Sequence, residues 1–335
     1  MFRLKCHQNY DVSHVNTWVA ASLGYRVQEL ELFIRTKEGT NNVLPRDLFA
    51  CETLVVLKLG TCFVMNVPTS VRMQSLKILH LHFVKLEDDN SIYRLIHGCP
   101  LLDELSMVEC VGKDVRIIHI FAPVLTKLSI KHYDHGTYEI VLDTPGLLYL
   151  ELDDNVKSVQ GYLVKNLYDL IKVQINVGGP FGLESHEIIS KAVTDLLMGI
   201  SRVQHLVLQW RFIEVLHKCN YRLPSMFHNL TSLELDPTDY LAWELMLLLL
   251  EKSPRLETLV FSDVPPCLVT HLKVIEIVGF QGFKEELKLF KYFLKNGVVL
   301  EKLRIVVGFD DLDYAKELEV VTKQKLLRLP RGSTI

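Results

Sequence analysis

The chain has 335 residues, of which 49% are hydrophobic and 23% are charged, and its formal net charge is −3. This composition is typical of a folded protein, because disordered chains lack the apolar side chains that a core needs. The near-neutral charge provides no general attraction for nucleic acid or for an anionic membrane surface, so we expect neither as a partner.

The beginning of the chain and its cysteines bear on the cellular compartment. No apolar segment of the kind found in secretory signals follows Met1, and the longest apolar run, residues 245–250, is far shorter than the roughly 20 residues that cross a bilayer. The seven cysteines are an odd number and lie scattered in apolar segments, which favours reduced thiols over a disulfide framework. We therefore expect a cytoplasmic or nuclear protein.

A short phrase with apolar residues at its first, fourth and sixth positions recurs along the whole chain. Its copies span residues 27–32, 54–59, 76–81, 102–107, 125–130, 147–152, 170–175, 203–208, 230–235, 256–261, 272–277 and 300–305. From Leu30 to Leu303, the fourth residues of the first and last copies, eleven steps cover 273 residues, a mean of about 25. Leucine-rich repeats have a period of roughly 20–29 residues and the same core pattern.

Each phrase predicts a short strand whose alternate side chains enter a core, because successive side chains of a strand point to opposite faces. One such unit cannot bury its apolar face alone, but stacked units share a continuous core. We therefore predict an α/β fold, a leucine-rich-repeat solenoid with a curved parallel sheet and with short helices and loops on the convex side. Each buried leucine contributes about 1.5–3 kcal/mol.

Some of the segments that return the chain to the next strand have helical periodicity. Short helices are expected at residues 91–99, 185–198, 241–252 and 284–295. The second of these accounts for the long step between Val173 and Leu206. A glycine-rich turn at residues 177–182 and the Pro265–Pro266 pair are the clearest breaks in the pattern.

The chain lacks several common sequence motifs of catalysis and of cofactor binding. The phosphate-binding glycine loops, the H-E-x-x-H metal motif and the G-x-S-x-G nucleophile motif do not occur. The cysteine pairs Cys51/Cys62 and Cys99/Cys110 share a spacing of eleven, which favours equivalent points of two repeats over a zinc site. We predict no enzyme, no cofactor and no resident metal.

Several further segments carry a more specific pattern. They are residues 265–268 (PPCL), 271–280 (HLKVIEIVGF), 290–296 (FKYFLKN), 299–303 (VLEKL) and 326–333 (LLRLPRGS), with 18–21 (WVAA), 99–105 (CPLLDEL) and 122–128 (APVLTKL) upstream. In these segments the chain resembles the plant F-box/LRR-repeat/FBD protein family. The resemblance implies a leucine-rich-repeat array at 1–263 and an FBD-like C-terminal region at 264–335 that continues the solenoid.

The same resemblance implies a function. Members of that family resemble substrate receptors of SCF-type cullin ubiquitin ligases, in which an N-terminal F-box binds the ligase adaptor and the repeats bind the target. Only 17 residues precede Trp18 here, and they contain no F-box. We therefore expect the substrate-recognition part of such a receptor, with the cullin-ligase adaptor as a partner only if an F-box lies upstream. The alternative is a stand-alone repeat scaffold or decoy that binds partners without recruiting a ligase.

The outward strand positions are the candidates for partner binding, since solenoids bind along their concave sheet. We predict that a protein target contacts Lys58, His80, His82, Glu104, Lys127, Ser129, Tyr149, Glu151, Gln174, His205, Gln209 and Glu234. Ser106 and Glu31 are further outward positions by the same alternation. His80 and His82 point outward together, either as ordinary polar surface or as part of a binding or metal site. The row mixes positive and negative charges, which favours a polar protein surface or peptide as the ligand.

Overall fold

The computed structural model describes residues 1–6, 12–34, 42–60, 63–110, 112, 114–132, 138–155, 159–178, 186–220, 222–235, 245, 248–249, 251–261, 273–280 and 300–307. The chain divides into two compact units. The first unit is Met1–Leu170 together with Gly179–Gly199, and the second is Ile171–Gly178 together with Ile200–Ile335. In both units neighbouring strands of the sheet run parallel, as expected for stacked leucine-rich repeats.

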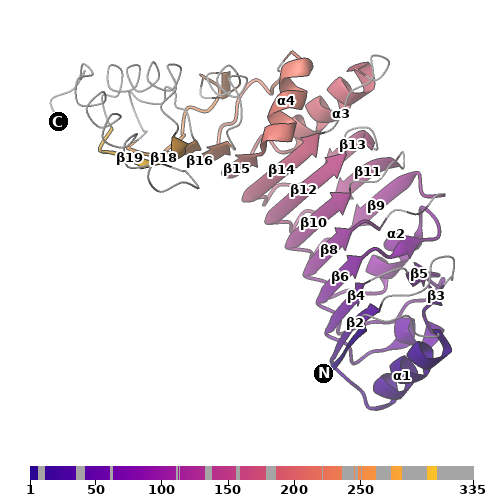
Figure 1. Ribbon diagram of the computed structural model, residues 1–335. Coiled ribbons are helices and arrows are strands. Elements are labelled where there is room, and N and C mark those ends of the chain that lie inside the picture. The colour runs from indigo at the N-terminus through magenta and orange to yellow at the C-terminus, as the bar shows by residue number, and fades with distance from the viewer. Residues whose placement is uncertain are drawn as a thin grey trace. The chain divides into compact units, whose positions relative to one another are not determined.

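The main sheet of the first unit contains one strand from each repeat, and Figure 1 shows these strands side by side. They are β1 (Phe2–Cys6), β2 (Glu29–Ile34), β4 (Val56–Gly60), β6 (Ile78–His82), β8 (Glu104–Val108), β10 (Lys127–His132) and β12 (Tyr149–Asn155), in this order across the sheet. Every strand from β2 onward begins two residues after the first residue of its predicted phrase. The hydrophobic phrase therefore located these strands correctly.

Two rows of apolar side chains fill the interior behind this sheet. The first row is Leu30, Leu57, Leu79, Leu105, Leu128 and Leu150, which are register partners in neighbouring strands and are almost completely buried. The second row, two positions further along each strand, is Leu32, Leu59, Leu81, Met107, Ile130 and Leu152. Because each leucine packs against its counterpart in the next repeat, the core is continuous along the unit.

A recurring main-chain contact sets the register between repeats. The amides of Val55 and Val56 both donate to the carbonyl oxygen of Gln28, at 2.7 Å and 3.0 Å. The amides of Lys77 and Ile78 do the same to Val55, at 2.8 Å and 3.1 Å. The same arrangement recurs from repeat to repeat in both units. Since it satisfies two amides at the start of each strand, successive strands begin at equivalent points.

The return segments of the first unit form a second layer. It contains two three-stranded parallel sheets, the first made of β3 (Asn42–Val43), β5 (Phe63–Met65) and β7 (Lys85–Leu86), and the second of β9 (Ile117–Phe121), β11 (Tyr138–Asp143) and β13 (Val159–Lys165). Helices α1 (Val12–Gly24), α2 (Ser91–His97) and α3 (His186–Gly199) and the 3₁₀ helix η1 (Arg46–Ala50) belong to the same unit.

Strands in the return segments differ from the turns, loops and short helices that the sequence predicted there. The reason is a second, shorter alternation: Ile118 and Ile120 of β9 and Ile140 and Leu142 of β11 are buried, whereas the residues between them face outward. Five-residue and six-residue segments of this kind pair with one another because the parallel stacking of repeats brings them together.

The second unit continues the repeat. Its strands are β14 (Lys172–Gly178), β15 (His205–Leu208), β16 (Ser232–Leu235), β17 (Thr258–Phe261), β18 (Val274–Phe280) and β19 (Lys302–Val307), each paired in parallel with the next. Helix α4 (Trp210–Lys218), which the sequence analysis did not predict, packs on β14. Gly178 permits this contact, because a side chain there would collide with Arg211, whose guanidinium donates to the Gly178 carbonyl oxygen at 2.8 Å.

Two of the four predicted helices are confirmed, as α2 and α3. Most of the helix predicted at 241–252 and all of the one predicted at 284–295 lie outside the described residues. Within the described ranges, none of the helices has the length and apolar character needed to span a membrane.

Candidate functional site

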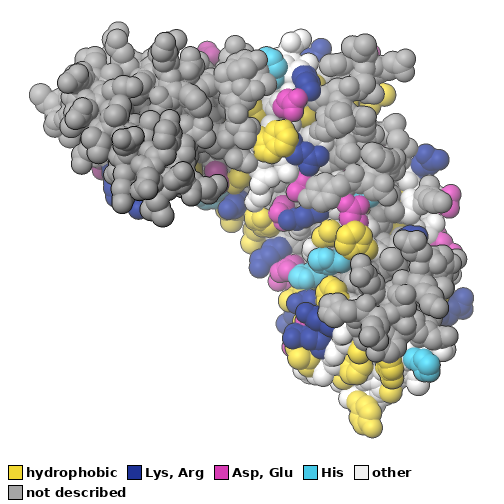
Figure 2. Space-filling model, viewed as in Figure 1, with side chains coloured by type: hydrophobic (Ala, Val, Ile, Leu, Met, Phe, Trp, Pro, Cys, Tyr) yellow, Lys and Arg dark blue, Asp and Glu magenta, His cyan; other side chains and the backbone are white. Residues whose placement is uncertain are grey.

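The outer face of the first unit, meaning the outward side chains of its main sheet, consists of three rows fixed by strand register. The first row is Glu29, Val56, Ile78, Glu104, Lys127 and Tyr149. The middle row is Arg3, Glu31, Lys58, His80, Ser106, Ser129 and Glu151. The third row is Lys5, Phe33, Gly60, His82, Val108, Lys131 and Asp153. Basic, acidic and histidine side chains intermingle over the first unit on the side seen in Figure 2.

A hollow of about 520 Å³ lies in this outer face, over β6, β8, β10 and β12. Its position follows from side-chain size. Ser106 and Ser129 are register partners on neighbouring strands, and both side chains are short. Larger side chains surround them on all sides, including His80 and Glu151 in the same row. We call this depression the serine hollow.

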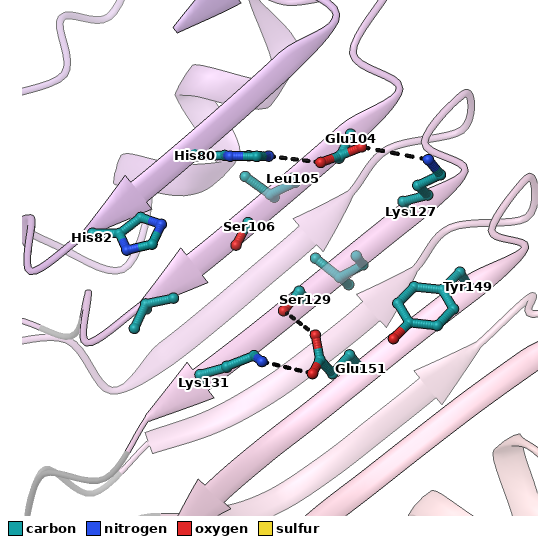
Figure 3. Close-up of a pocket in the computed structure, with 12 residues that line it drawn as sticks. His80, His82, Glu104, Leu105, Ser106, Lys127, Ser129, Lys131, Tyr149 and Glu151 are labelled. Atoms are coloured by element: carbon teal, nitrogen blue, oxygen red, sulfur yellow. Dashed lines mark hydrogen bonds and ion pairs between the residues drawn. The ribbon is translucent and has the colours of Figure 1, made fainter. Parts of the chain in front are cut away.

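The polar groups around the serine hollow form two connected sets, drawn in Figure 3. In the first, Glu104 lies between His80 and Lys127: His80 Nε2 is 2.7 Å from its Oε1, and Lys127 Nζ is 3.6 Å from its Oε2. In the second, Glu151 accepts a hydrogen bond of 2.8 Å from the Ser129 hydroxyl and lies 2.6 Å from Lys131 Nζ. Each set joins neighbouring strands, so the rim of the hollow is held in place by its own hydrogen bonds and ion pairs.

Tyr149 completes one side of the hollow. Burial, followed by the charge of the neighbouring Glu151, raises the pKa of its hydroxyl above the ordinary value. The Tyr149 hydroxyl is therefore protonated at neutral pH and can donate a hydrogen bond into the hollow.

His82 stands at the other side, where it packs edge-on against Phe33 with ring centroids 6.0 Å apart. The Phe33 ring covers Gly60, where any side chain would collide with it. Burial, and then the nearby His80 and Lys131, lower the pKa of His82 below its ordinary value of 6.5. The imidazole is therefore neutral at pH 7.

Outside the hollow, Glu31 likewise lies between two hydrogen-bond donors, here both cations. Arg3 Nε is 2.5 Å from one of its oxygens and Lys58 Nζ is 3.4 Å from the other. The hydrogen bond from Arg3 is the main reason why the pKa of Glu31 is lowered, against the opposing effect of burial. The alternation of side chains along the strand predicted that Glu31 is an outward residue. It does point outward, but Arg3 and Lys58 contact its carboxylate and the residue is buried.

Seven of the twelve predicted contact residues line the serine hollow. They are His80, His82, Glu104, Lys127, Ser129, Tyr149 and Glu151. Lys58 lies in the same middle row, outside the hollow, paired with Glu31. The other four, Gln174, His205, Gln209 and Glu234, belong to the second unit. Whether any of the twelve contacts a partner stays a prediction.

Lys131 and Val108 also line the hollow, and the sequence analysis missed both. The phrase was read over six residues, whereas the strands β8 and β10 extend one and two residues beyond it. Continuing the alternation from Lys127 through Ser129 would have reached Lys131.

The structure also bears on the open question of His80 and His82. Among the described residues, no group of three or more His, Cys, Asp or Glu side chains is placed to hold a metal ion. His80 contacts Glu104 and His82 contacts Phe33, so both are part of the polar and aromatic lining of this face.

Comparison with known proteins gives the family. Residues 15–163 match the family model described as FBD-associated F-box protein At5g56370, LRR repeats, and residues 262–305 match the FBD model. The F-box/LRR-repeat protein At1g06630 of Arabidopsis thaliana is 31% identical over 313 residues, covering 89% of this chain and 75% of that protein. The chain belongs to the plant F-box/FBD/LRR-repeat family.

Other members of the family show the same coverage. The F-box/FBD/LRR-repeat protein At2g26030 of Arabidopsis thaliana is 30% identical over 363 residues, covering 96% of this chain and 80% of that protein. The F-box/FBD/LRR-repeat protein At3g52680 of the same plant is 29% identical, with 90% and 68% covered. The resemblance recognised in the sequence is confirmed.

The two family matches can be placed on the fold. The leucine-rich-repeat match contains every residue of the serine hollow, and the FBD match contains β18 and the start of β19. The predicted division at 263/264 stays a prediction, since the two compact units divide the repeat array at other positions.

Proposed function

We propose that this chain is a protein-binding module whose outer face holds a target protein, and that it forms the substrate-recognition part of an SCF-type ubiquitin-ligase receptor. The observation that carries the proposal is the serine hollow: an open depression with a pre-organised rim of hydrogen-bonded and ion-paired side chains, inside the segment that matches the family's repeats. Membership of an F-box/FBD/LRR-repeat family supports the link to a ligase. The adaptor is a partner wherever an F-box is joined to the module, and we expect the module to act in the cytoplasm or nucleus.

The chemistry of the hollow favours binding over catalysis. A serine nucleophile needs a base that takes its proton, most often a histidine in hydrogen-bond contact. In the hollow, Ser129 donates to Glu151, whereas His80 is engaged with Glu104. The polar groups thus stabilise one another in a fixed arrangement, which suits recognition of a complementary surface, and we propose no enzymatic activity.

Affinity purification with two matched variants tests the binding role. The tagged chain is expressed in plant cells, and the proteins that co-purify are identified by mass spectrometry. Ser129→Tyr fills the hollow, whereas Glu139→Tyr places the same aromatic side chain at an outward position of β11 in the second layer. A partner that is retained by the wild type and by Glu139→Tyr but lost by Ser129→Tyr is the expected result.

Two other outcomes would contradict parts of the proposal. If both variants retain the same partners, the outer face is not the binding surface, and if no partner exceeds the background, the chain is not a binding module under these conditions and the proposal fails. A cullin-ligase adaptor in the eluate supports the receptor role. If the module joined to an F-box captures the target but no adaptor, that role is overturned in favour of the stand-alone scaffold or decoy.

A further inference from the structure

The outer face of the first unit has a regular electrostatic arrangement. Three carboxylates, Glu31, Glu104 and Glu151, each lie between two hydrogen-bond donors, and both oxygens of each carboxylate are engaged. The donors of Glu31 and Glu104 come from the strands on either side, and both donors of Glu151 come from β10. Each of these carboxylate oxygens therefore already has a partner within the face itself.

The lysines and the arginine are more exposed than the carboxylates that they contact. The side chains of Arg3 and Lys58 are 50% and 32% exposed, against 9% for Glu31. Lys127 is 59% exposed, against 29% for Glu104, and Lys131 is 33% exposed, against 18% for Glu151. His80, at 22%, is the exception. A partner that approaches this face meets ammonium and guanidinium groups first and the carboxylates behind them.

The serine hollow concentrates the remaining donor capacity. Lys127 and Lys131 lie on β10, each two residues from Ser129, so that one cation stands on either side of the short floor. Each ammonium group has three N–H donors, and the described contacts of each lysine involve one carboxylate. The hydroxyls of Ser106 and Tyr149 also line the hollow. The donors that remain available therefore include those of the two exposed ammonium groups, although the formal charges nearly cancel.

From this geometry we propose that the serine hollow binds the side-chain carboxylate of an Asp or Glu residue in an acidic segment of the partner protein. The carboxylate lies between Lys127 and Lys131 and accepts from the Ser106 hydroxyl at the floor. This inference rests on the proposed function, because it specifies the chemistry of the target that the module holds.

The arrangement favours an acidic protein segment over nucleic acid. Nucleic-acid affinity comes from many phosphates that neutralise uncompensated Lys and Arg side chains. Here the middle row contains Glu31, between Arg3 and Lys58, and Glu151 at its other end, and a continuous phosphate backbone would have to pass these carboxylates. A single acidic side chain that enters the hollow meets the exposed ammonium groups of Lys127 and Lys131 before it reaches the less exposed Glu104 and Glu151.

Selection from a random dodecapeptide display library, with the purified full chain as bait, tests the inference. Lys127→Glu/Lys131→Glu reverses both cations of the hollow. The control Lys85→Glu/Lys165→Glu makes the same change of net charge on β7 and β13 of the second layer, where both lysines are exposed. Thermal unfolding of all three proteins verifies that they fold.

We expect peptides enriched in Asp or Glu with the wild type and with the control. In fluorescence anisotropy, a selected peptide should bind at least about tenfold more weakly to Lys127→Glu/Lys131→Glu, as for loss of a close charge pair. Replacing its critical Glu by Gln should weaken binding to the wild type by a similar factor. Affinity should fall with added salt, since exposed charges are screened.

Several results overturn the inference. In the selection, these are a failure to obtain any peptide or the recovery of peptides without acidic residues. In the binding assay, they are equal affinity of an acidic peptide for the reversed variant, or displacement of the peptide by an RNA or DNA oligonucleotide whose own binding requires Lys127 and Lys131. If Ser129→Tyr nevertheless abolishes capture of a cellular partner, the proposed function stands and only the acidic specificity fails. If partner capture also fails, both are wrong.

Discussion

The hydroxyl of Tyr138 donates to the carboxylate of Asp154, with its oxygen 2.7 Å and 2.6 Å from the two carboxylate oxygens. Tyr138 begins β11 of the second layer and Asp154 lies near the end of β12 of the main sheet, so the contact joins the two layers of the first unit. Both residues are almost completely buried. His132 packs edge-on against the Tyr138 ring at 5.2 Å and lies 3.2 Å from Glu109.

Removal of this hydroxyl gives the first prediction. Burial, followed by the charge of Asp154, raises the pKa of Tyr138 far above its ordinary value, so the group remains a donor. Tyr138→Phe should lower the free energy of unfolding by about 1.5–3 kcal/mol, because a buried charged acceptor loses a hydrogen bond. Urea denaturation measures this. Tyr149→Phe, on the outer face, should change it by less than about 0.5 kcal/mol. Equal effects of the two variants would contradict a structural role for the contact.

Truncation of two adjacent residues of β8 should lower the free energy of unfolding by very different amounts. Leu105 belongs to the buried row and Ser106 to the floor of the serine hollow. Leu105→Ala should destabilise the fold by about 2–5 kcal/mol, because it leaves a cavity in the continuous core. Ser106→Ala should cost less than about 0.5 kcal/mol. Thermal unfolding of both variants checks this, and a large loss from Ser106→Ala would mean that the serine supports the fold.

Two cysteines should resist alkylation in the folded protein. Burial raises the pKa of both Cys99 and Cys110 to about 12. At pH 8 only about one molecule in 10,000 would carry the thiolate that reacts, and access is blocked as well. Iodoacetamide labelling read by peptide mass spectrometry should therefore modify the half-buried Cys51 before Cys99 and Cys110. Cys99 and Cys110 should react only after denaturant is added, and rapid native labelling of either would show that the repeats open.

The pH dependence of His82 follows from its surroundings. Burial, with His80 and Lys131, lowers its pKa below 6.5, so between the folded pKa and 6.5 the unfolded chain binds more protons. The contribution of His82 to stability is therefore complete above pH 6.5 and is lost as the pH falls through the folded pKa. An NMR titration of the imidazole should give a midpoint below 6.5.

Two variants provide the control for this titration. Phe33→Ala, which uncovers the ring, should move the midpoint upward toward 6.5. His82→Gln should remove the corresponding part of the pH dependence of unfolding. A wild-type midpoint at or above 6.5 would show that the imidazole is not buried in solution.

Much of the fold could be read from the sequence because one physical rule repeats. A leucine such as Leu105 must be buried, its neighbour Glu104 must not, and the same choice recurs about every 25 residues. That rule determined the parallel strands of both units and the direction of their side chains, and helical periodicity between the phrases located α2 and α3. It also identified most of the residues that line the serine hollow.

Other features depended on tertiary contacts. The return strands β9, β11 and β13 form only because stacking brings three short segments together, and alone each is too short to distinguish from a loop. The contacts of Glu104 with His80 and Lys127 depend on the register of strands from three repeats. The contact of Tyr138 with Asp154 depends on the packing of the second layer against the main sheet. Periodicity determines which way a side chain points, whereas the groups that it contacts depend on the parallel register that places distant repeats side by side.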